Sequence, residues 1–336
     1  MRCITSQSKF GSKPVFSKKF LKDISNHTEL IDNILEANSK NENKDAKKTD
    51  GKKKNKIIVP KLDDANWAGT KKSDQCTLIL TEGDSAKSMA IAGLAVVGRD
   101  KYGVFPLRGK LINTMNASDA DVAKNKEIAD LKKILGLQEG RKYNDVSELR
   151  YGKIMIMTDQ DADGSHIKGL IMNFIAKWTT LLKIDGFICS LLTPIVKVWK
   201  GSNKQKSINF YTLTEYNDWL SANNGGKGYN TKYYKGLGTS TANEAKEYFK
   251  DLKVLNYVNK TEDDANALVL AFKKTETDQR KEWIKQHTEK FEGLDYNTKK
   301  DVPISKLINN ELVLFSISDN IRSIPNIVDG LKPGQR

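Results

Sequence analysis

Three aspartates stand at alternate positions of one short segment, Asp159, Asp161 and Asp163. They directly follow the apolar run 154–157, which is typical of a short buried strand, and they precede a helical pattern. Carboxylates this close repel one another unless a cation neutralises them. The sequence therefore predicts a divalent metal ion at this turn.

A second predicted strand, residues 77–81, is also followed by an acid, Glu82. In an α/β sheet the site lies at the carboxyl ends of the parallel strands, so we expect Glu82 to lie beside Asp159 and Asp161. Oxygen ligands in this number favour Mg²⁺, which keeps several waters and bridges to phosphate. Such an ion polarises a phosphoryl oxygen and orients the phosphate backbone for in-line attack.

The elements that position these acids form an α/β pattern, in which strands alternate with helices and a mainly parallel sheet is expected. Apolar residues from 167 to 182 recur at helical spacing, and Ser165 is placed to cap that helix. A further helix is expected at 85–95. Thr241 and Glu244 form a predicted capping box after a glycine loop. Later segments at 263–290 and 305–321 also have helical patterns.

The residues alone leave three other interpretations of the acidic turn open. A calcium loop requires a bidentate Glu at its twelfth position, where this chain has Leu170. A phosphoacceptor aspartate would need a lysine on a neighbouring strand and would leave Glu82 unexplained. Capping of the following helix accounts for one aspartate through the helix dipole, but not for three.

The overall charge predicts a polyanionic partner, since 56 Lys and Arg residues against 42 acidic residues give a net charge of +14. The alternative interpretation is that the lysines merely keep the protein surface soluble. Arg108, Lys110, Lys168 and Lys235 are candidates to hold phosphates, whereas His166 could contact DNA or serve in capping and packing. No apolar run is long enough for a membrane span, and three widely spaced cysteines indicate a reducing interior.

Several motifs together resemble the TOPRIM domain of type IIA DNA topoisomerases of the eukaryotic, single-chain type. They are Glu82-Gly-Asp-Ser-Ala, Pro106-Leu-Arg-Gly-Lys, Thr158-Asp-Gln-Asp-Ala-Asp-Gly-Ser-His-Ile-Lys, Tyr234-Lys-Gly-Leu-Gly-Thr-Ser, and Ser323-Ile-Pro-Asn-Ile-Val-Asp-Gly-Leu-Lys-Pro-Gly-Gln-Arg336. The resemblance implies a Rossmann-like TOPRIM fold with an α+β extension. It places the end of a transducer region at 1–36, a Lys-rich linker at 37–75, the TOPRIM domain with its extension at 76–300, and the start of a winged-helix DNA-cleavage domain at 301–336.

The resemblance also implies a set of functional residues. Glu82, Asp159 and Asp161 would be Mg²⁺ ligands, with Asp163 in support through water and Mn²⁺ or Ca²⁺ as substitutes in binding. Glu82 would also be catalytic, assisting proton transfer during resealing. The expected contacts to double-stranded DNA are Arg108, Lys110, His166, Lys168, Lys235, Lys332 and Arg336.

The family's reaction sets further expectations. Such enzymes break both strands of one duplex, pass another duplex through the break and reseal it, using ATP that binds elsewhere in the full-length protein. The full-length enzyme is a nuclear homodimer, and the nucleophilic tyrosine comes from the partner subunit's winged-helix domain. The chain printed here is therefore expected to be an inactive fragment by itself, with its own oligomeric state left open.

Two functions other than a type IIA topoisomerase module are considered. A different TOPRIM enzyme, such as a primase or nuclease, is disfavoured by the Lys-Gly-Leu-Gly and Asp-Gly-Leu-Lys-Pro motifs. A non-catalytic DNA-binding module is favoured only if the acids bind no metal. Residues 113–118, Asn-Thr-Met-Asn-Ala-Ser, depart from the family pattern, which leaves the contacts of that loop undefined.

Overall fold

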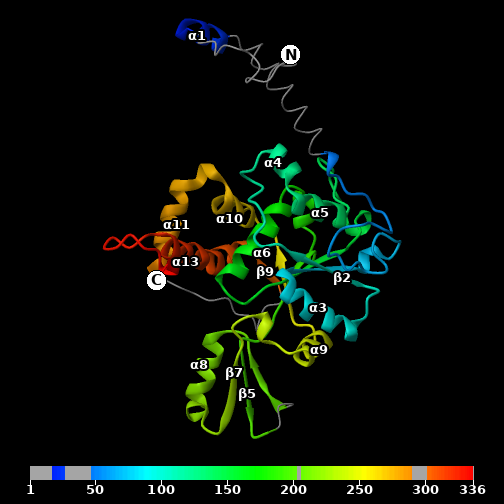
Figure 1. Ribbon diagram of the computed structural model, residues 1–336, viewed down its shortest axis with the longest axis vertical. Coiled ribbons are helices and arrows are strands. Elements are labelled where there is room, and N and C mark those ends of the chain that lie inside the picture. Colours follow the sequence, from blue (N-terminus) through cyan, green and yellow to red (C-terminus); the bar gives the residue numbers. More distant parts are fainter. Residues whose placement is uncertain (1–16, 27–46, 203–205, 290–300, 336) are drawn as a thin grey trace.

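The structure is a computed structural model that describes residues 17–26, 47–202, 206–289 and 301–335 (Figure 1). The sequence also predicts a helical segment around 28–35, which lies outside these residues, as does the first half (37–46) of the Lys/Asn-rich tract 37–56. Helix α1 (Lys18–Asn26) precedes the folded body. None of the helices in the described ranges combines the length and apolarity that a membrane crossing requires.

The central sheet has six strands in the order β2-β1-β3-β4-β8-β9. Their bounds are β1 (Thr77–Glu82), β2 (Tyr102–Leu107), β3 (Lys153–Met157), β4 (Ile188–Leu191), β8 (Val254–Val258) and β9 (Asp301–Pro303). The first four strands of this order pair in parallel, and β8 runs antiparallel to β4. The mainly parallel α/β sheet expected from the sequence is confirmed.

The register of β1 and β3 decides where the acids lie. Leu80 pairs with Ile156, and Thr81 pairs with Met157. The two strands therefore end at the same edge of the sheet, where Glu82 is the last residue of β1 and Thr158 directly follows β3. This arrangement fulfils the geometric condition for one site at the carboxyl ends of the strands.

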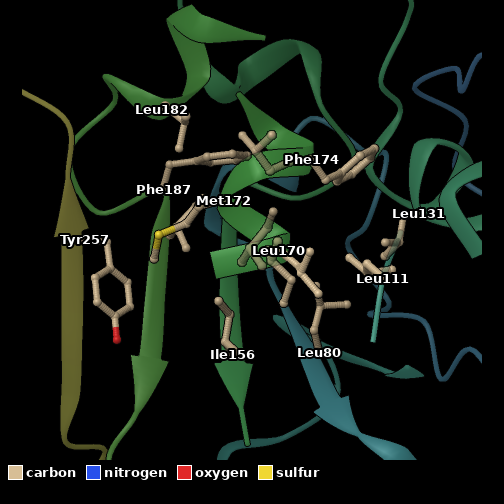
Figure 2. Close-up of a cluster of buried hydrophobic side chains, with 14 of the residues drawn as sticks. Leu80, Leu111, Leu131, Ile156, Leu170, Met172, Phe174, Leu182, Phe187 and Tyr257 are labelled. Atoms are coloured by element: carbon tan, nitrogen blue, oxygen red, sulfur yellow. The ribbon is translucent and has the colours of Figure 1, made fainter. Parts of the chain in front are cut away.

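Helices cover both faces of this sheet, because alternate strand residues point to opposite faces. On one face, Leu80 and Ile156 pack with Leu170 of helix α6 (Ala162–Ile175), in the cluster that Figure 2 shows. On the other face, Ile79 and Met155 belong to a second core beneath helices α3 (Gly83–Val97) and α9 (Ala242–Lys250). The strands are thus buried on both sides, as their apolar runs require.

The remaining helices surround one side of the sheet. They are α4 (Asp119–Lys124), α5 (Lys126–Leu135), α7 (Thr179–Leu182), α10 (Glu262–Phe272), α11 (Thr277–Glu289), α12 (Ile304–Lys306), the π-helix η8 (Leu307–Leu312) and α13 (Val313–Ser323). Short 3₁₀ turns occur at Ser73–Gln75, Val146–Glu148, Asn224–Gly226, Leu237–Thr239, Lys274–Glu276 and Pro333–Gln335. The single helix predicted at 305–321 is instead α12, η8 and α13 in succession, so a π-helical turn interrupts it.

A smaller three-stranded sheet projects from the central body (Figure 1). Its order is β6-β5-β7, with β5 (Val196–Lys200), β6 (Ile208–Phe210) and β7 (Tyr229–Tyr233), and helix α8 (Leu213–Ala222) packs on it. Val196, Val198, Phe210 and Tyr216 form a core of their own. This is an α+β extension of the kind that the sequence led us to expect, and β7 leads into the glycine loop that reaches the acidic turn.

Candidate metal centre

Glu82 and the acidic turn meet at the carboxyl edge of β1 and β3. Glu82 Oε2 accepts a hydrogen bond from the Asp159 backbone N–H at 3.3 Å. Burial raises the pKa of the half-buried Glu82 carboxyl, and the negative charges of Asp159 and Asp161 raise it further, against the opposing effect of that hydrogen bond. The expected adjacency of Glu82 and Asp159 is confirmed.

Asp159 is held by the loop that follows β7. Its Oδ1 accepts a hydrogen bond from the Leu237 backbone N–H at 2.7 Å. A Cβ atom at Gly236 would lie 2.3 Å from Asp159 Oδ2, so only glycine permits this approach. The predicted glycine loop therefore places the Leu237 backbone N–H against the Asp159 carboxylate.

The same loop is anchored at its far end by Glu244. The predicted capping box is present: the Thr241 hydroxyl accepts from the Glu244 N–H, and the Glu244 carboxylate accepts from the Thr241 N–H. This carboxylate also accepts from the Lys232 ammonium at 2.8 Å and from the Tyr234 hydroxyl. This partly buried carboxylate thus connects the end of β7 to the start of α9.

Asp161 caps helix α6, and its Oδ1 accepts the Gly164 N–H at 2.8 Å. The prediction that Ser165 caps this helix was wrong, because α6 begins at Ala162. Three residues into the helix, the Ser165 hydroxyl instead bonds the Asp161 carbonyl oxygen at 3.1 Å. The capping interpretation of the turn therefore applies to Asp161 but accounts for neither Asp159 nor Asp163.

Asp163 is paired with two cations. Its carboxylate accepts from the Lys110 ammonium at 2.8 Å and from the Arg322 guanidinium at 2.8 and 3.1 Å. These partners hold the pKa of Asp163 well below its usual range. Both cations also lie over the Phe315 ring, at 4.3 Å for Lys110 and 5.9 Å for Arg322. Our sequence reasoning missed Arg322, which lies in the last turn of α13 and directly precedes the motif that begins at Ser323.

The chemistry of these donors fits a magnesium ion. Within the described ranges, no group of three or more acidic, histidine or cysteine side chains is already arranged to hold a metal ion. Asp159 and Asp161 each accept a backbone N–H through one oxygen. Mg²⁺ binds through one or two carboxylates and completes its octahedron with water. Glu82, Asp159 and Asp161 offer hard oxygen atoms at one sheet edge, so they suit an ion of this kind.

Comparison with known proteins identifies the two parts of this fold. Residues 77–188 match the Toprim domain, and residues 191–320 match the C-terminal associated domain of TOPRIM. Over 334 residues the chain is 50% identical to "DNA topoisomerase 2" of Arabidopsis thaliana, covering 98% of this chain and 22% of that protein. The DNA topoisomerase 2 of Saccharomyces cerevisiae is 49% identical over 333 residues, covering 97% of this chain and 23% of that protein. The chain belongs to the type II DNA topoisomerase family.

A solved member of the family has the same architecture. The DNA-binding, cleavage and re-ligation domain of Plasmodium falciparum topoisomerase II superposes with a TM-score of 0.76 at 48% identity, over 84% of this chain and 38% of that one. The chain spans less than a quarter of the length of the two curated topoisomerases above. Within the family it corresponds to the Toprim region and its C-terminal companion.

Exposed cations lie around the acids of this topoisomerase segment. Arg108 and Lys110 follow β2, Lys235 lies in the glycine loop, and all three side chains are exposed. A pocket of about 440 Å³ opens beside Glu82, and Lys61 and Arg108 are among the residues that line it. Lys332 is exposed near the C-terminal end, and Arg336 lies outside the described residues.

Two other expected DNA contacts have internal roles. Lys168 is only 1% exposed and its ammonium pairs with the Glu311 carboxylate at 3.3 Å, so the expectation that it contacts DNA was wrong. His166 is half-buried and stacks on Phe315, with ring centroids 3.8 Å apart. Burial, aided by the nearby Lys110 charge, lowers the pKa of His166 to about 4, so the ring is neutral at pH 7. The packing alternative stated for this histidine describes its position better than DNA binding does.

Proposed function

We propose that this chain is the metal-binding part of a type II DNA topoisomerase that breaks, passes and reseals double-stranded DNA with the use of ATP. The observation that carries the proposal is the meeting of Glu82 and Asp159 across β1 and β3, with Asp161 at the start of the adjoining helix. Membership of the family supports the reaction class. Because the curated relatives are more than four times longer, the complete reaction belongs to a larger protein.

The proposed metal is Mg²⁺, with Mn²⁺ or Ca²⁺ able to replace it in binding. Glu82, Asp159 and Asp161 would hold the ion directly. Asp163, whose carboxylate is paired with Lys110 and Arg322, would contact the ion through water. When bound, the ion would supply Lewis-acid polarisation of a DNA phosphate. Glu82 would also hold and return a proton during resealing, a task that suits a carboxyl group whose pKa is raised.

The proposed DNA contacts are the exposed cations around this edge. Arg108, Lys110 and Lys235 would bind phosphates and place the backbone beside the acids, with Lys332 and Arg336 contributing from the C-terminal segment. The net charge of +14 favours association with a polyanion in general. His166 and Lys168 are left out of this set because both are engaged inside the protein.

The rest of the proposal concerns the larger protein. Residues 1–36 would end a transducer region, 37–75 would be a linker, 76–300 the TOPRIM domain with its extension, and 301–336 the start of a winged-helix cleavage domain. The full-length enzyme would be a nuclear homodimer that binds ATP elsewhere. Each subunit would lend its tyrosine to the other's metal site, so we expect this chain alone to neither relax nor cleave DNA.

Isothermal titration of the chain with Mg²⁺ and Mn²⁺ tests the metal site. Wild-type protein should bind, and Asp159→Ala combined with Asp161→Ala should weaken binding by at least about 100-fold, since ligand loss costs more than the 10- to 100-fold of an outer-shell change. Asp278→Asn, an exposed acid on α11, is the matched control and should bind as wild type does. Absence of binding heat from the wild-type chain would refute the metal site.

The reaction itself is tested on a longer protein that adds a winged-helix domain. We expect Mg²⁺-dependent covalent protein–DNA complexes from the longer protein and none from this chain alone. Glu82→Gln should change the formation or the resealing of these complexes. DNA cleavage by the chain alone would contradict the proposed need for a tyrosine in trans.

A further inference from the structure

A buried cluster joins the acidic turn to the C-terminal helices. Glu311 lies in the π-helix η8, and its side chain is only 11% exposed. Its Oε2 accepts from the Ser165 hydroxyl at 2.9 Å and from the Lys168 ammonium at 3.3 Å. Both partners lie on α6, immediately after the turn, and α6 contacts η8 and α13, the latter labelled beside it in Figure 1.

Ser165 transmits this contact to Asp161. Its hydroxyl carries one proton and has two acceptors, the Glu311 carboxylate at 2.9 Å and the Asp161 carbonyl at 3.1 Å. The Asp161 carbonyl also accepts the Ser165 backbone N–H at 3.1 Å. The rotamer of Ser165, and with it the first turn of α6, therefore depends on where Glu311 lies. That turn carries Asp161, whose carboxylate is one of the three proposed metal ligands.

Lys168 fixes the position of the Glu311 carboxylate. Burial by itself lowers the pKa of the Lys168 ammonium, but the Glu311 charge outweighs burial and raises this pKa to about 12. A lysine kept charged in the interior holds its carboxylate partner in one place, because separating the two would leave both charges desolvated. Glu311 is thus held by Lys168 on one side and presented to Ser165 on the other.

The π-helical turn sets the direction of Glu311. A π-helix inserts one residue into an α-helix, and one residue corresponds to roughly 100° of rotation about the helix axis. A regular α-helix through 307–312 would therefore turn Glu311 away from α6 relative to α12. Single π-helical turns of this kind are frequent at functional sites.

We propose that Glu311 is a positioning residue for the metal ligands: through Ser165 it sets the geometry of Asp161 according to how η8 and α13 pack on α6. The proposal rests on the metal site proposed above and adds a residue 150 positions further along the chain to it. Movement of the C-terminal helices would then change metal affinity without any contact between those helices and the ion.

The test measures Mn²⁺ binding by this chain, with titration calorimetry for affinity and electron paramagnetic resonance for the coordination of the bound ion. Ser165→Ala removes the bridging hydroxyl and keeps the Glu311–Lys168 pair. The double variant Glu311→Leu with Lys168→Met removes the pair without leaving an unpaired buried charge. Each variant should weaken Mn²⁺ binding by about 10-fold, the lower end for an outer-shell partner, and should alter the resonance line shape.

The control is Glu247→Gln, which neutralises the partner of another buried lysine, Lys197, on the α9 side of the molecule. It should match wild type in affinity and line shape. Thermal unfolding without metal verifies that each variant is folded. Wild-type affinity and line shape in both folded test variants would overturn the role of Glu311 while leaving the metal site intact. Failure of the wild-type chain to bind Mn²⁺ would instead overturn the metal site, and the positioning role with it.

Discussion

The ends of β1 and β3 are built on the same plan, a strand that runs into acids and then a helix, yet they differ in how the acids are held. At the end of β1, Glu82 makes no side-chain cap for α3 and faces an open pocket. At the end of β3, each aspartate is fixed by a different segment. Leu237 donates to Asp159, Asp161 caps α6, and Lys110 and Arg322 pair with Asp163.

This difference separates two requirements of a metal site. The end of β1 supplies a carboxylate whose pKa is raised by burial and by the neighbouring aspartates, which is the electrostatic condition for recruiting a cation. The end of β3 supplies rigidity, because Asp159 and Asp163 are bonded to Leu237 and Arg322, which lie 78 and 159 residues further along the chain. Asp161 is bonded locally, to the first turn of α6. Variants that remove these bonds one at a time test which of them matters for stability and for metal binding.

The largest expected effect on stability comes from removing the buried ion pair between Lys168 of α6 and Glu311 of η8. Lys168→Met should lower the free energy of unfolding by about 3–5 kcal/mol, because it removes the cation of this ion pair while the Glu311 carboxylate stays buried. Urea unfolding followed by circular dichroism measures this difference. Adding Glu311→Leu to the variant should restore most of the loss. A single variant as stable as wild type would mean that water reaches Glu311 and that the ion pair is weak.

An intermediate effect is expected at the anchor of the glycine loop. Burial raises the pKa of Glu244, but the hydrogen bonds from Lys232, Thr241 and Tyr234 prevail and lower it to about 2. A carboxylate whose folded pKa lies below its usual value of 4.5 stabilises the protein fully above about pH 4.5. This contribution is lost as the pH falls from there toward 2.

Glu244→Gln should therefore cost about 1.5–3 kcal/mol at pH 7, the usual value of hydrogen bonds to a charged group. The gap between variant and wild type should narrow steadily between about pH 4.5 and pH 2. Urea unfolding at pH 7, 4 and 2.5 measures this gap. Glu262→Gln, at the exposed start of α10, is a control that should show no such pH-dependent difference. A gap that is the same at all three pH values would contradict the assigned role.

The local half of this site could be predicted from the sequence. Apolar runs before Glu82 and Asp159 define two strands, and parallel pairing brings their ends together. The capping box at Thr241 was also readable, since its two residues lie three positions apart. These features depend on short spacings that the printed sequence displays directly.

The other half depends on contacts between distant segments. Glu311 is one glutamate in the helix predicted at 305–321, and only the π-helical turn and the packing of η8 on α6 show that it is buried against Lys168. Lys168 itself carries a charge that the sequence suggests is exposed, which is why we expected it on DNA. Burial of a charged residue is decided by a partner far along the chain, and spacing does not reveal that partner.

The smallest expected effect on stability comes from removing the exposed ion pair between Arg322 and Asp163. Arg322 keeps 45% of its side chain exposed, so Arg322→Gln should leave the melting temperature of the metal-free chain essentially unchanged. Its effect should appear in metal binding, because the variant removes a positive charge that stands against one of the acids. Mg²⁺ should then bind about 3- to 10-fold more tightly, a gain that shrinks as salt is added. Lys281→Gln removes a similar exposed pair on α11 and should change neither quantity. Equal Mg²⁺ affinity in the Arg322 variant and in wild type would contradict the idea that Arg322 competes with the ion for the Asp163 carboxylate, which Lys110 also contacts.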